Sequence, residues 1–426
     1  MATDTHRAIE TVWRIEAPRL IAGLTRLVRD VGDAEELAQD ALVAALEQWP
    51  AEGVPDNPGA WLMTTARRRA VDRIRRDTTY QRKLAEIGRD IDEVAPDVAE
   101  TDGIGDDLLR LVFVACHPVL SREARAALTL RLLGSLTTDE IARAFLVPEP
   151  TVAQRIVRAK RTLAKARVPF EVPQGAELAA RLSSVLEVVY LIFNEGYAAT
   201  AGDDWMRPEL CAEALRLGRV LARLTPREPE VHGLVALMEI QASRAAARTG
   251  PDGEPILLAD QNRARWDRLL IGRGLAALTR AEALVDGRPG PYVLQALIAA
   301  GHARARRFED TDWVRIAALY ERLAETMPSP VVELNRAVAL SMAYGPATGL
   351  ALLDQLTAVP SLQGYHLLPS VRGDLLARLG RHAEARAEFE RAASLTRNER
   401  DRTLLRDRAA AMTDPGAHAE AGDGKR

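Results

Sequence analysis

Two segments of this sequence are strongly basic and carry the side chains best suited to binding a polyanion. Residues 122–167 hold ten Lys or Arg against four Asp or Glu, and residues 67–83 hold eight Lys or Arg against two Asp, so each has a net charge of +6. Arg and Lys gathered on helix faces pair with the phosphates of nucleic acids. The alternative is a solvated basic face with no partner.

One acidic segment precedes the two basic segments, and another lies between them. Residues 1–66 carry a net charge of −6, and residues 84–121 carry −7. The whole 426-residue chain has 57 Lys and Arg against 60 Asp and Glu, so its net charge of −3 is the sum of opposed blocks. This near-neutral total therefore does not exclude a nucleic-acid partner.

The second basic segment has the pattern of a helix-turn-helix. Its apolar spacing predicts three helices, over residues 122–133, 138–145 and 151–166. Gly134 is expected as a left-handed residue after the first helix, and Thr137 or Thr138 as the N-cap of the second. One apolar stripe of the last helix is expected to face inward: Val152, Ile156, Ala159 and Leu163.

The opposite side of that last helix has the chemistry of major-groove recognition. Arginine can donate two hydrogen bonds to guanine and glutamine can bind adenine, whereas Lys160 and Lys165 are placed to pair with phosphates. A solvated face on a helical bundle is the alternative, but the preceding helix and the short turn at residues 146–150 favour DNA. The residues predicted to contact DNA are Thr151, Gln154, Arg155, Arg158, Lys160 and Arg161.

This segment resembles the domain of bacterial sigma-70 factors that binds the promoter −35 element, most closely in the small extracytoplasmic-function (ECF) type. Pro150 departs from that family, in which a small residue is common, but proline is tolerated in the first turn of a helix. The resemblance implies that the predicted DNA contacts read the −35 element. It is carried by Leu120, Arg125, Leu130, Arg131, Gly134, Leu136, Thr137, Glu140, Ile141, Ala142, Thr151, Val152, Arg158, Ala159 and Lys160.

The first basic segment supports the same resemblance. A helix is predicted from Pro58, a residue favoured in the first turn, through Trp61 to about Arg76. Its buried stripe is expected to comprise Ala66, Ala70, Val71 and Ile74. The resemblance implies that this helix binds the promoter −10 element, through Arg67, Arg68, Arg69, Arg73, Arg75 and Arg76.

The acidic N-terminal stretch is predicted to form two helices that break near residues 30–33, with Asp33 as an N-cap. The resemblance implies that residues 49–59 form a loop that captures an unstacked base of the melted strand, while Trp13, Trp49 and Trp61 are interpreted as core residues. It also implies that an acidic patch docks on core RNA polymerase, through Asp33, Glu35, Glu36, Gln39 and Asp40.

Residues 84–121 are predicted to form an acidic linker, because Pro96, Gly103 and Gly105 interrupt their middle. In the family that the chain resembles, the connector at this place threads the active-site channel of the polymerase. A solvated tether without that role fits the composition equally well. Both interpretations stay open.

The chain from residue 176 to about 411 is predicted to be a long helical array. Similar stretches begin at Tyr320, Leu353 and Phe389, spaced near the ~34 residues of tetratricopeptide helix pairs. Stacked pairs of this kind bind peptides or partner proteins. A set of polar residues earlier in the array is interpreted as helix caps and ion pairs, with a polar pocket as the alternative: Asn194, Glu195, Asp260, Arg265 and Asp267.

Several classes of protein are not indicated. Cys116 and Cys211 are too few for a disulfide scaffold, and the Cys116-His117 pair lacks the second pair that a zinc site needs. No nucleophile–base set or Gly-rich phosphate loop is present, so we expect no enzyme, no cofactor and no metal. No signal peptide or membrane-spanning run is evident, which favours a cytoplasmic protein.

We therefore expect an all-α fold with residues 1–83 as a polymerase- and −10-binding domain, 84–121 as the linker and 122–168 as the helix-turn-helix domain. Residues 176–411 would form the repeat domain and 412–426 a disordered tail. The expected function is that of an alternative ECF-type sigma factor, which directs RNA polymerase to specific promoters and carries a regulatory repeat domain. The alternative is a classical helix-turn-helix regulator with a repeat-protein sensor, which leaves the acidic patch and residues 67–83 unexplained.

Overall fold

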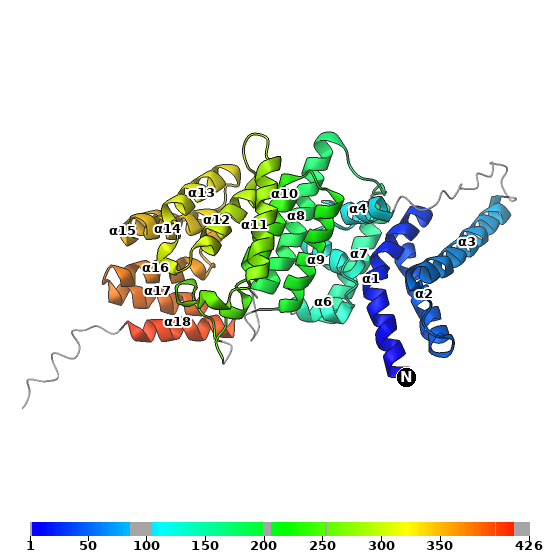
Figure 1. The fold of residues 1–426 in the computed structure, drawn as a ribbon, viewed down its shortest axis with the longest axis horizontal. Helices are drawn as coiled ribbons and strands as arrows, with labels where there is room; N and C mark the ends of the chain where they lie inside the picture. Colours follow the sequence, from blue (N-terminus) through cyan, green and yellow to red (C-terminus); the bar gives the residue numbers. More distant parts are fainter. Residues whose placement is uncertain are drawn as a thin grey trace, which may run out of the picture. The chain divides into compact units, whose positions relative to one another are not determined.

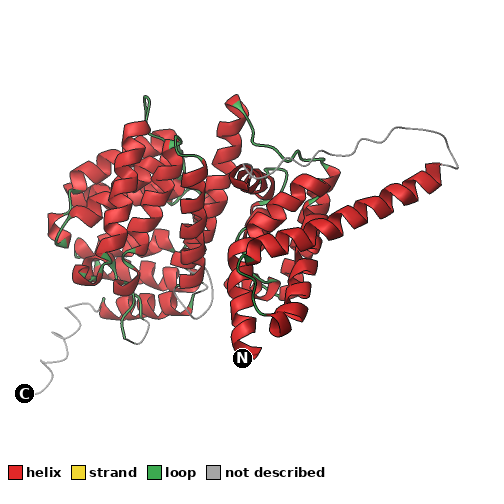
Figure 2. Cartoon of the chain, turned by 45° about the vertical axis from the view of Figure 1, so that its right-hand side comes forward, coloured by secondary structure: helices red, strands yellow, loops and turns green. Residues whose placement is uncertain are grey.

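The computed structural model describes residues 2–85, 104–145, 147–198, 206–251, 254–396 and 398–412. Every regular element in these residues is a helix, which confirms the predicted all-α class (Figure 2). The one β-bridge among them is isolated and joins Thr249 to Pro255. The chain divides into two compact units, Met1–Leu191 and Ile192–Arg426.

Three helices begin the first unit: α1 (Ala2–Val28), α2 (Val31–Glu52) and α3 (Pro58–Ala85). Helix α2 is capped by Asp30 and not by Asp33 as predicted, because the Asp30 carboxylate accepts hydrogen bonds from the amides of Gly32 (2.7 Å) and Asp33 (3.0 Å). Helix α3 begins at the predicted proline but extends nine residues beyond Arg76.

Part of the predicted acidic linker is a core helix. Helix α4 (Ile104–Ala115) buries Leu111, Phe113 and Ala115 completely or almost so, and packs against α1. The prediction over 84–121 was wrong for this part because the negative charge of the segment masks its apolar run at residues 111–115. The remaining stretch, residues 86–103, lies outside the described residues.

The helix-turn-helix is present with nearly the predicted bounds, as α5 (Arg122–Leu132), α6 (Thr138–Phe145) and α7 (Glu149–Lys165). Thr137 and Glu140 form a capping box at α6, in which each side chain accepts a hydrogen bond from the other's amide. Ser135, at φ +55°, is the left-handed residue after α5, not Gly134 as predicted. Helix α7 starts two residues early because Pro150 fits its first turn.

The first part of helix α8 (Gly175–Tyr197) completes this unit. Ser184 Oγ donates to the carbonyl of Cys116 at 2.7 Å, and the guanidinium of Arg181 donates to the carbonyl of Phe113 at 2.9 Å. Arg125, itself buried, donates to Ser184. The unit therefore extends past residue 168, the predicted end of the helix-turn-helix domain.

The second unit is a series of antiparallel helices. From α12 to α18, each helix packs against the next one in the chain (Figure 1). Short 3-10 turns separate some of them. The helices are α9 (Pro208–Leu224), α10 (Pro229–Ala242), α11 (Arg268–Leu284), α12 (Pro291–Arg304), α13 (Trp313–Thr326), α14 (Pro330–Tyr344), α15 (Pro346–Leu356), α16 (Leu367–Arg378), α17 (His382–Leu395) and α18 (Glu399–Ala411).

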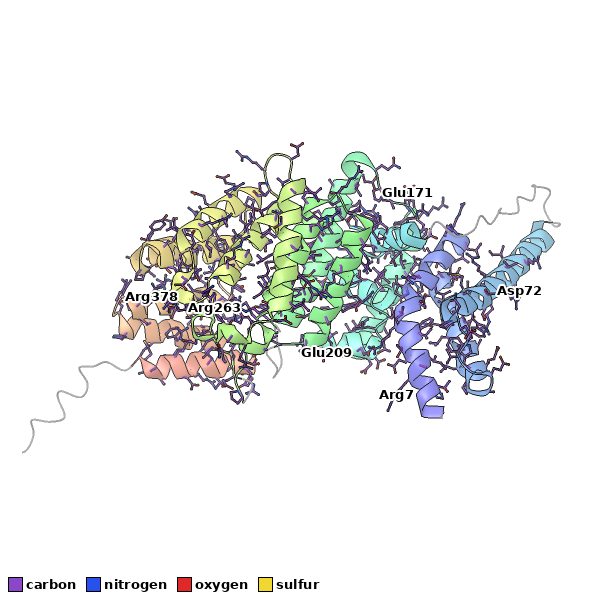
Figure 3. All side chains as sticks on the ribbon, viewed as in Figure 1. Arg7, Asp72, Glu171, Glu209, Arg263 and Arg378 are labelled. Carbon is purple, nitrogen blue, oxygen red and sulfur yellow. The ribbon has the colours of Figure 1, made fainter. Side chains whose placement is uncertain are left out.

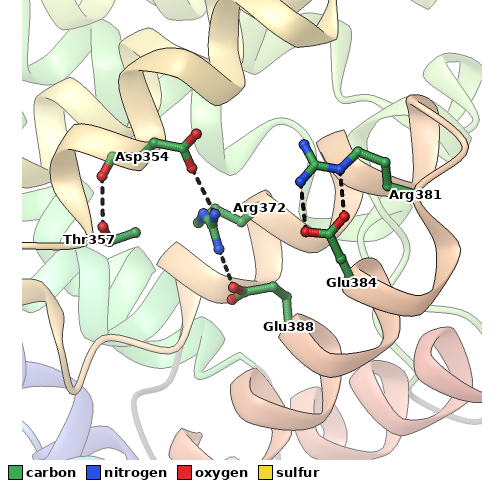
Figure 4. Close-up of polar contacts among 6 residues, drawn as sticks. All are labelled: Asp354, Thr357, Arg372, Arg381, Glu384 and Glu388. Carbon is green, nitrogen blue, oxygen red and sulfur yellow. Dashed lines mark hydrogen bonds and ion pairs between the residues drawn. The ribbon is translucent and has the colours of Figure 1, made fainter.

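The similar stretches of the sequence occupy alternate helices of this array. They lie in α13, α15 and α17, and so at matching places in successive helix pairs. Arg372 of α16 joins two of these helices, because its guanidinium pairs with Asp354 of α15 (2.7 Å) and with Glu388 of α17 (Figure 4). Gly373 lets α16 approach α17 so closely that its Cα faces the ring of the fully buried Phe389.

Arginines also hold the long connection between α10 and α11. Arg263, which is labelled in Figure 3, donates from Nη1 to the carbonyls of His302 (2.5 Å) and Ala305 (2.8 Å) at the end of α12. Its guanidinium also lies over the ring of Trp266. Asp267 caps α11 through the amides of Leu269 and Leu270. Glu195 pairs with Arg207. These contacts agree with the interpretation for two of the five polar residues, Glu195 as an ion-pair partner and Asp267 as a helix cap.

The packing of Gly373 gives a test of the C-terminal array. A Cβ at this position would lie 2.8 Å from the Phe389 ring, so we expect Gly373→Ala to lower the free energy of unfolding by about 1–3 kcal/mol. In α11, Gly272 has nothing within 4 Å of such a Cβ, and Gly272→Ala should raise stability by up to about 1 kcal/mol through helix propensity. Urea denaturation measures both, and equal effects of the two substitutions would contradict this packing.

Candidate nucleic-acid interface

Helix α7 presents its predicted recognition face to solvent. Val152, Ile156, Ala159 and Leu163 are all buried, at 6 % exposure or less, which confirms the inward stripe. Gln154, Arg158 and Arg161 are exposed on the other side, and their side chains form no hydrogen bond or ion pair within the described residues. Thr151 and Arg155 are half-buried at its edges. The exposed amide and guanidinium groups remain available to base edges or phosphates.

Lys160 is placed differently from the rest of that set. Its Nζ lies 2.5 Å from a carboxylate oxygen of Glu35 in α2, so in this structure it pairs within the chain. The other oxygen of Glu35 accepts hydrogen bonds from Arg131 Nε of α5 (2.6 Å) and from Gln39 Nε2 (2.9 Å). Glu35 is only 4 % exposed, so its predicted place on a docking surface for the polymerase is not accessible in this structure.

The acidic patch of α2 faces the basic helix α3. Arg73 pairs with Asp33 at 2.8 Å and with Glu36 at 3.2 Å, and Arg69 donates to the backbone carbonyl of Asp40 at 2.8 Å. These carboxylates stay substantially exposed, from 43 % for the Asp33 side chain to 66 % for Glu36. The two predicted sets therefore lie side by side and partly neutralise each other.

The outer side of α3 keeps three of its six predicted arginines exposed, namely Arg67, Arg68 and Arg75. The side chain of Arg76 lies outside the described residues. Ala66 and Ala70 are buried as predicted, but Val71 and Ile74 are 40 % and 38 % exposed, so the predicted stripe was wrong at these two positions. The basic face of α3 thus includes apolar side chains.

Of the three tryptophans of this unit that were predicted as core residues, Trp49 is buried, whereas Trp13 and Trp61 are half-buried. Trp49 is 1 % exposed, which confirms it as a core residue, and its ring meets that of Trp61 edge-on at 5.3 Å. Helix α2 runs on to Glu52, so the loop predicted over residues 49–59 is confined to residues 53–57. Asn57 then caps α3, since its side chain accepts from the amide of Ala60 at 3.1 Å.

The two cysteines have structural surroundings. Burial raises the pKa of the Cys116 thiol to about 11 and that of Cys211 to about 12, so both stay protonated at neutral pH. Cys116 Sγ lies 3.3 Å from Thr129 Oγ1, and the neighbouring His117 accepts from the amide of Val119 through Nδ1. The described residues contain no group of His, Cys, Asp and Glu side chains arranged to hold a metal ion.

This unit has the features of a helical DNA-binding protein: a recognition helix with a free polar face, and a second basic helix beside an acidic one. Residues 13–79 match the Sigma-70 region 2 family and residues 110–163 match Sigma-70 region 4. Residues 181–282 match a family of unknown function. No helix in the described part of the chain is long and apolar enough to cross a membrane.

Known proteins resemble the chain over two different lengths. The ECF RNA polymerase sigma factor SigK of Mycobacterium ulcerans (strain Agy99) is 31% identical over 149 residues, which cover 34% of this chain and 78% of SigK. SigK of Mycobacterium bovis (strain BCG / Pasteur 1173P2) is equally similar, with the same coverage. An uncharacterized protein of Rhizobium meliloti (strain 1021) is 44% identical over 396 residues, 91% of this chain and 92% of that protein. The chain belongs to the ECF family of RNA polymerase sigma factors.

The exposed face of α7 gives a test of its role. Arg158→Ala should weaken binding to a duplex carrying the −35 sequence by about 1–3 kcal/mol and relax preference at one base pair. The duplex is obtained by selection with the wild-type protein, and binding is measured by fluorescence anisotropy. Arg273→Ala, which removes an exposed arginine from α11, is the matched control for charge. An Arg158→Ala protein that behaves like this control would contradict the recognition role.

Proposed function

We propose that this chain directs core RNA polymerase to a restricted set of promoters, reading the −35 element with α7 and the −10 element with α3. The observation that carries the proposal is the helix-turn-helix, whose Gln154, Arg158 and Arg161 project into solvent without partners in the described residues. The membership of the ECF family supports the same role. The polymerase supplies the catalysis, and this chain supplies promoter recognition and strand opening.

The basic side chains on the two helices have separate tasks in this proposal. Arg67, Arg68 and Arg75 approach the −10 region, and α7 approaches the −35 region. Both sets release counterions from the phosphates, so promoter binding should weaken steeply as salt rises. The exposed carboxylates of Asp33, Glu36 and Asp40 dock on the polymerase.

We propose that the C-terminal array regulates this activity by binding a peptide or protein. A cleft of about 520 Å³ between α11, α12 and α13 supports the proposal. Its lining includes the apolar side chains of Val285, Leu297 and Leu319. Arg315 and Arg322 also line it, and their side chains are unpaired within the described residues. Such a lining favours an amphipathic segment that carries acidic side chains.

Association with core RNA polymerase tests the proposed function. The full-length chain should co-elute with core polymerase, and Glu36→Lys should weaken that complex by about tenfold, near 1.4 kcal/mol, because it reverses an exposed charge of the docking patch. Glu47→Lys reverses an exposed charge elsewhere on α2 and should change the affinity little. Duplex binding without any association with the polymerase would favour the classical helix-turn-helix regulator.

A further inference from the structure

A single buried carboxylate ties the acidic docking helix to the helix-turn-helix. We propose that Glu35 is an intramolecular latch that holds α7 and α5 against α2 in the free chain, and that DNA phosphates compete with it for Lys160 and Arg131. The inference rests on the proposed function, because Lys160 and Arg131 can bind DNA in the open state only if the helix-turn-helix binds promoter DNA. It adds a self-inhibited state of the free protein.

Both carboxylate oxygens of Glu35 lie within ion-pair distance of a cation. Its two carboxylate oxygens face two cations from different helices, Lys160 Nζ at 2.5 Å and Arg131 Nε at 2.6 Å. The side chain of Glu35 is 5 % exposed, and those of its partners are 23 % and 24 % exposed. Removing a carboxylate from water is costly unless such partners compensate it, so Glu35 stays buried only while α5 and α7 remain in place.

A second ion pair also joins the N-terminal helices α1 and α2 to the helix-turn-helix of α5, α6 and α7. Arg14 of α1 pairs with Glu140 of α6 at 3.0 Å, and both side chains are partly exposed. Between the two ion-pair sites lies a cleft of about 410 Å³, lined by Trp13, Leu42 and Val43 together with polar side chains. Charge pairs therefore span a hollow contact. Opening the contact at this cleft sacrifices little apolar packing there, while α4 stays packed against α1, which suits a limited and reversible movement of α5 and α7.

The charges explain why DNA can open the latch. One carboxylate faces two cations, so the cluster retains a net positive charge of about one and still attracts a polyanion. Several phosphates in a duplex can replace the one carboxylate, whose solvation is restored when α7 leaves. The same movement exposes Glu35 next to the docking patch. In the open state, therefore, Lys160 and Arg131 can bind DNA and the whole acidic patch of α2 is exposed to the polymerase.

Binding of duplex DNA to the full-length protein tests the latch. Glu35→Gln removes the carboxylate charge but keeps the side-chain shape, and it should tighten binding of a fluorescein-labelled duplex by about tenfold at low salt. The matched control is Glu47→Gln on the same helix, which removes one exposed negative charge and should change affinity less than about twofold. Equal affinities of the two variants would overturn the latch.

A distance measurement tests the latch independently of DNA. Spin labels at Gln48 of α2 and Ala164 of α7, both exposed, should give one narrow separation in the otherwise wild-type chain and a longer, broader one with Glu35→Gln. If Glu35→Gln lengthens the label separation but no variant binds the duplex, the latch is supported and the proposed function is contradicted. Unchanged distances in the variant would overturn the latch.

The exposed ion pair supplies a variant that does not disturb the core. Arg14→Ala removes a positive charge, so the loss of charge alone would weaken DNA binding. If the latch exists, the same substitution should lengthen the label separation and tighten DNA binding by about two- to threefold, because it removes the ion pair with Glu140. Arg7→Ala, at an exposed position on the same helix, is its control. If Glu35→Gln fails to fold, as judged by circular dichroism, a label separation unchanged by Arg14→Ala overturns the proposal.

Discussion

A buried carboxylate must be compensated, and Glu35 shows how much of the first unit depends on that constraint. Its side chain is held by Arg131, Lys160 and Gln39, which come from three helices. Because an unpaired charge at 4 % exposure is unstable, the positions of α2, α5 and α7 are linked through it. The recognition helix is therefore placed by electrostatics as well as by its apolar stripe.

The acidic and basic segments of the sequence are complementary within the folded unit. Arg73 meets Asp33 and Glu36 across α2 and α3, and Lys160 meets Glu35. The exposed face of α7 and the outer arginines of α3 remain outside these pairs. Some charges of the unit therefore stabilise the fold, and others can bind a polyanion. In the proposed latch, Lys160 and Arg131 pair with Glu35 in the free chain and with DNA phosphates in the open state.

Local patterns predicted the helix-turn-helix well because its capping and periodicity involve neighbours in sequence. The capping box of Thr137 and Glu140 and the stripe from Val152 to Leu163 are examples. The burial of Glu35 was missed, since its partner Arg131 lies 96 residues away and composition does not show which charges meet. Helix α4 was missed because its acidic neighbours dominated the charge count, although the apolar run ending at Ala115 was a usable signal.

Run-off transcription with the full-length chain and core RNA polymerase, on a library of genomic promoters, tests whether this chain directs the polymerase to promoters. We expect transcripts from a restricted set of promoters that appear only when both proteins are present and start downstream of shared −35 and −10 sequences. Transcription by core polymerase that is unchanged by this chain across the whole library would contradict the proposed function.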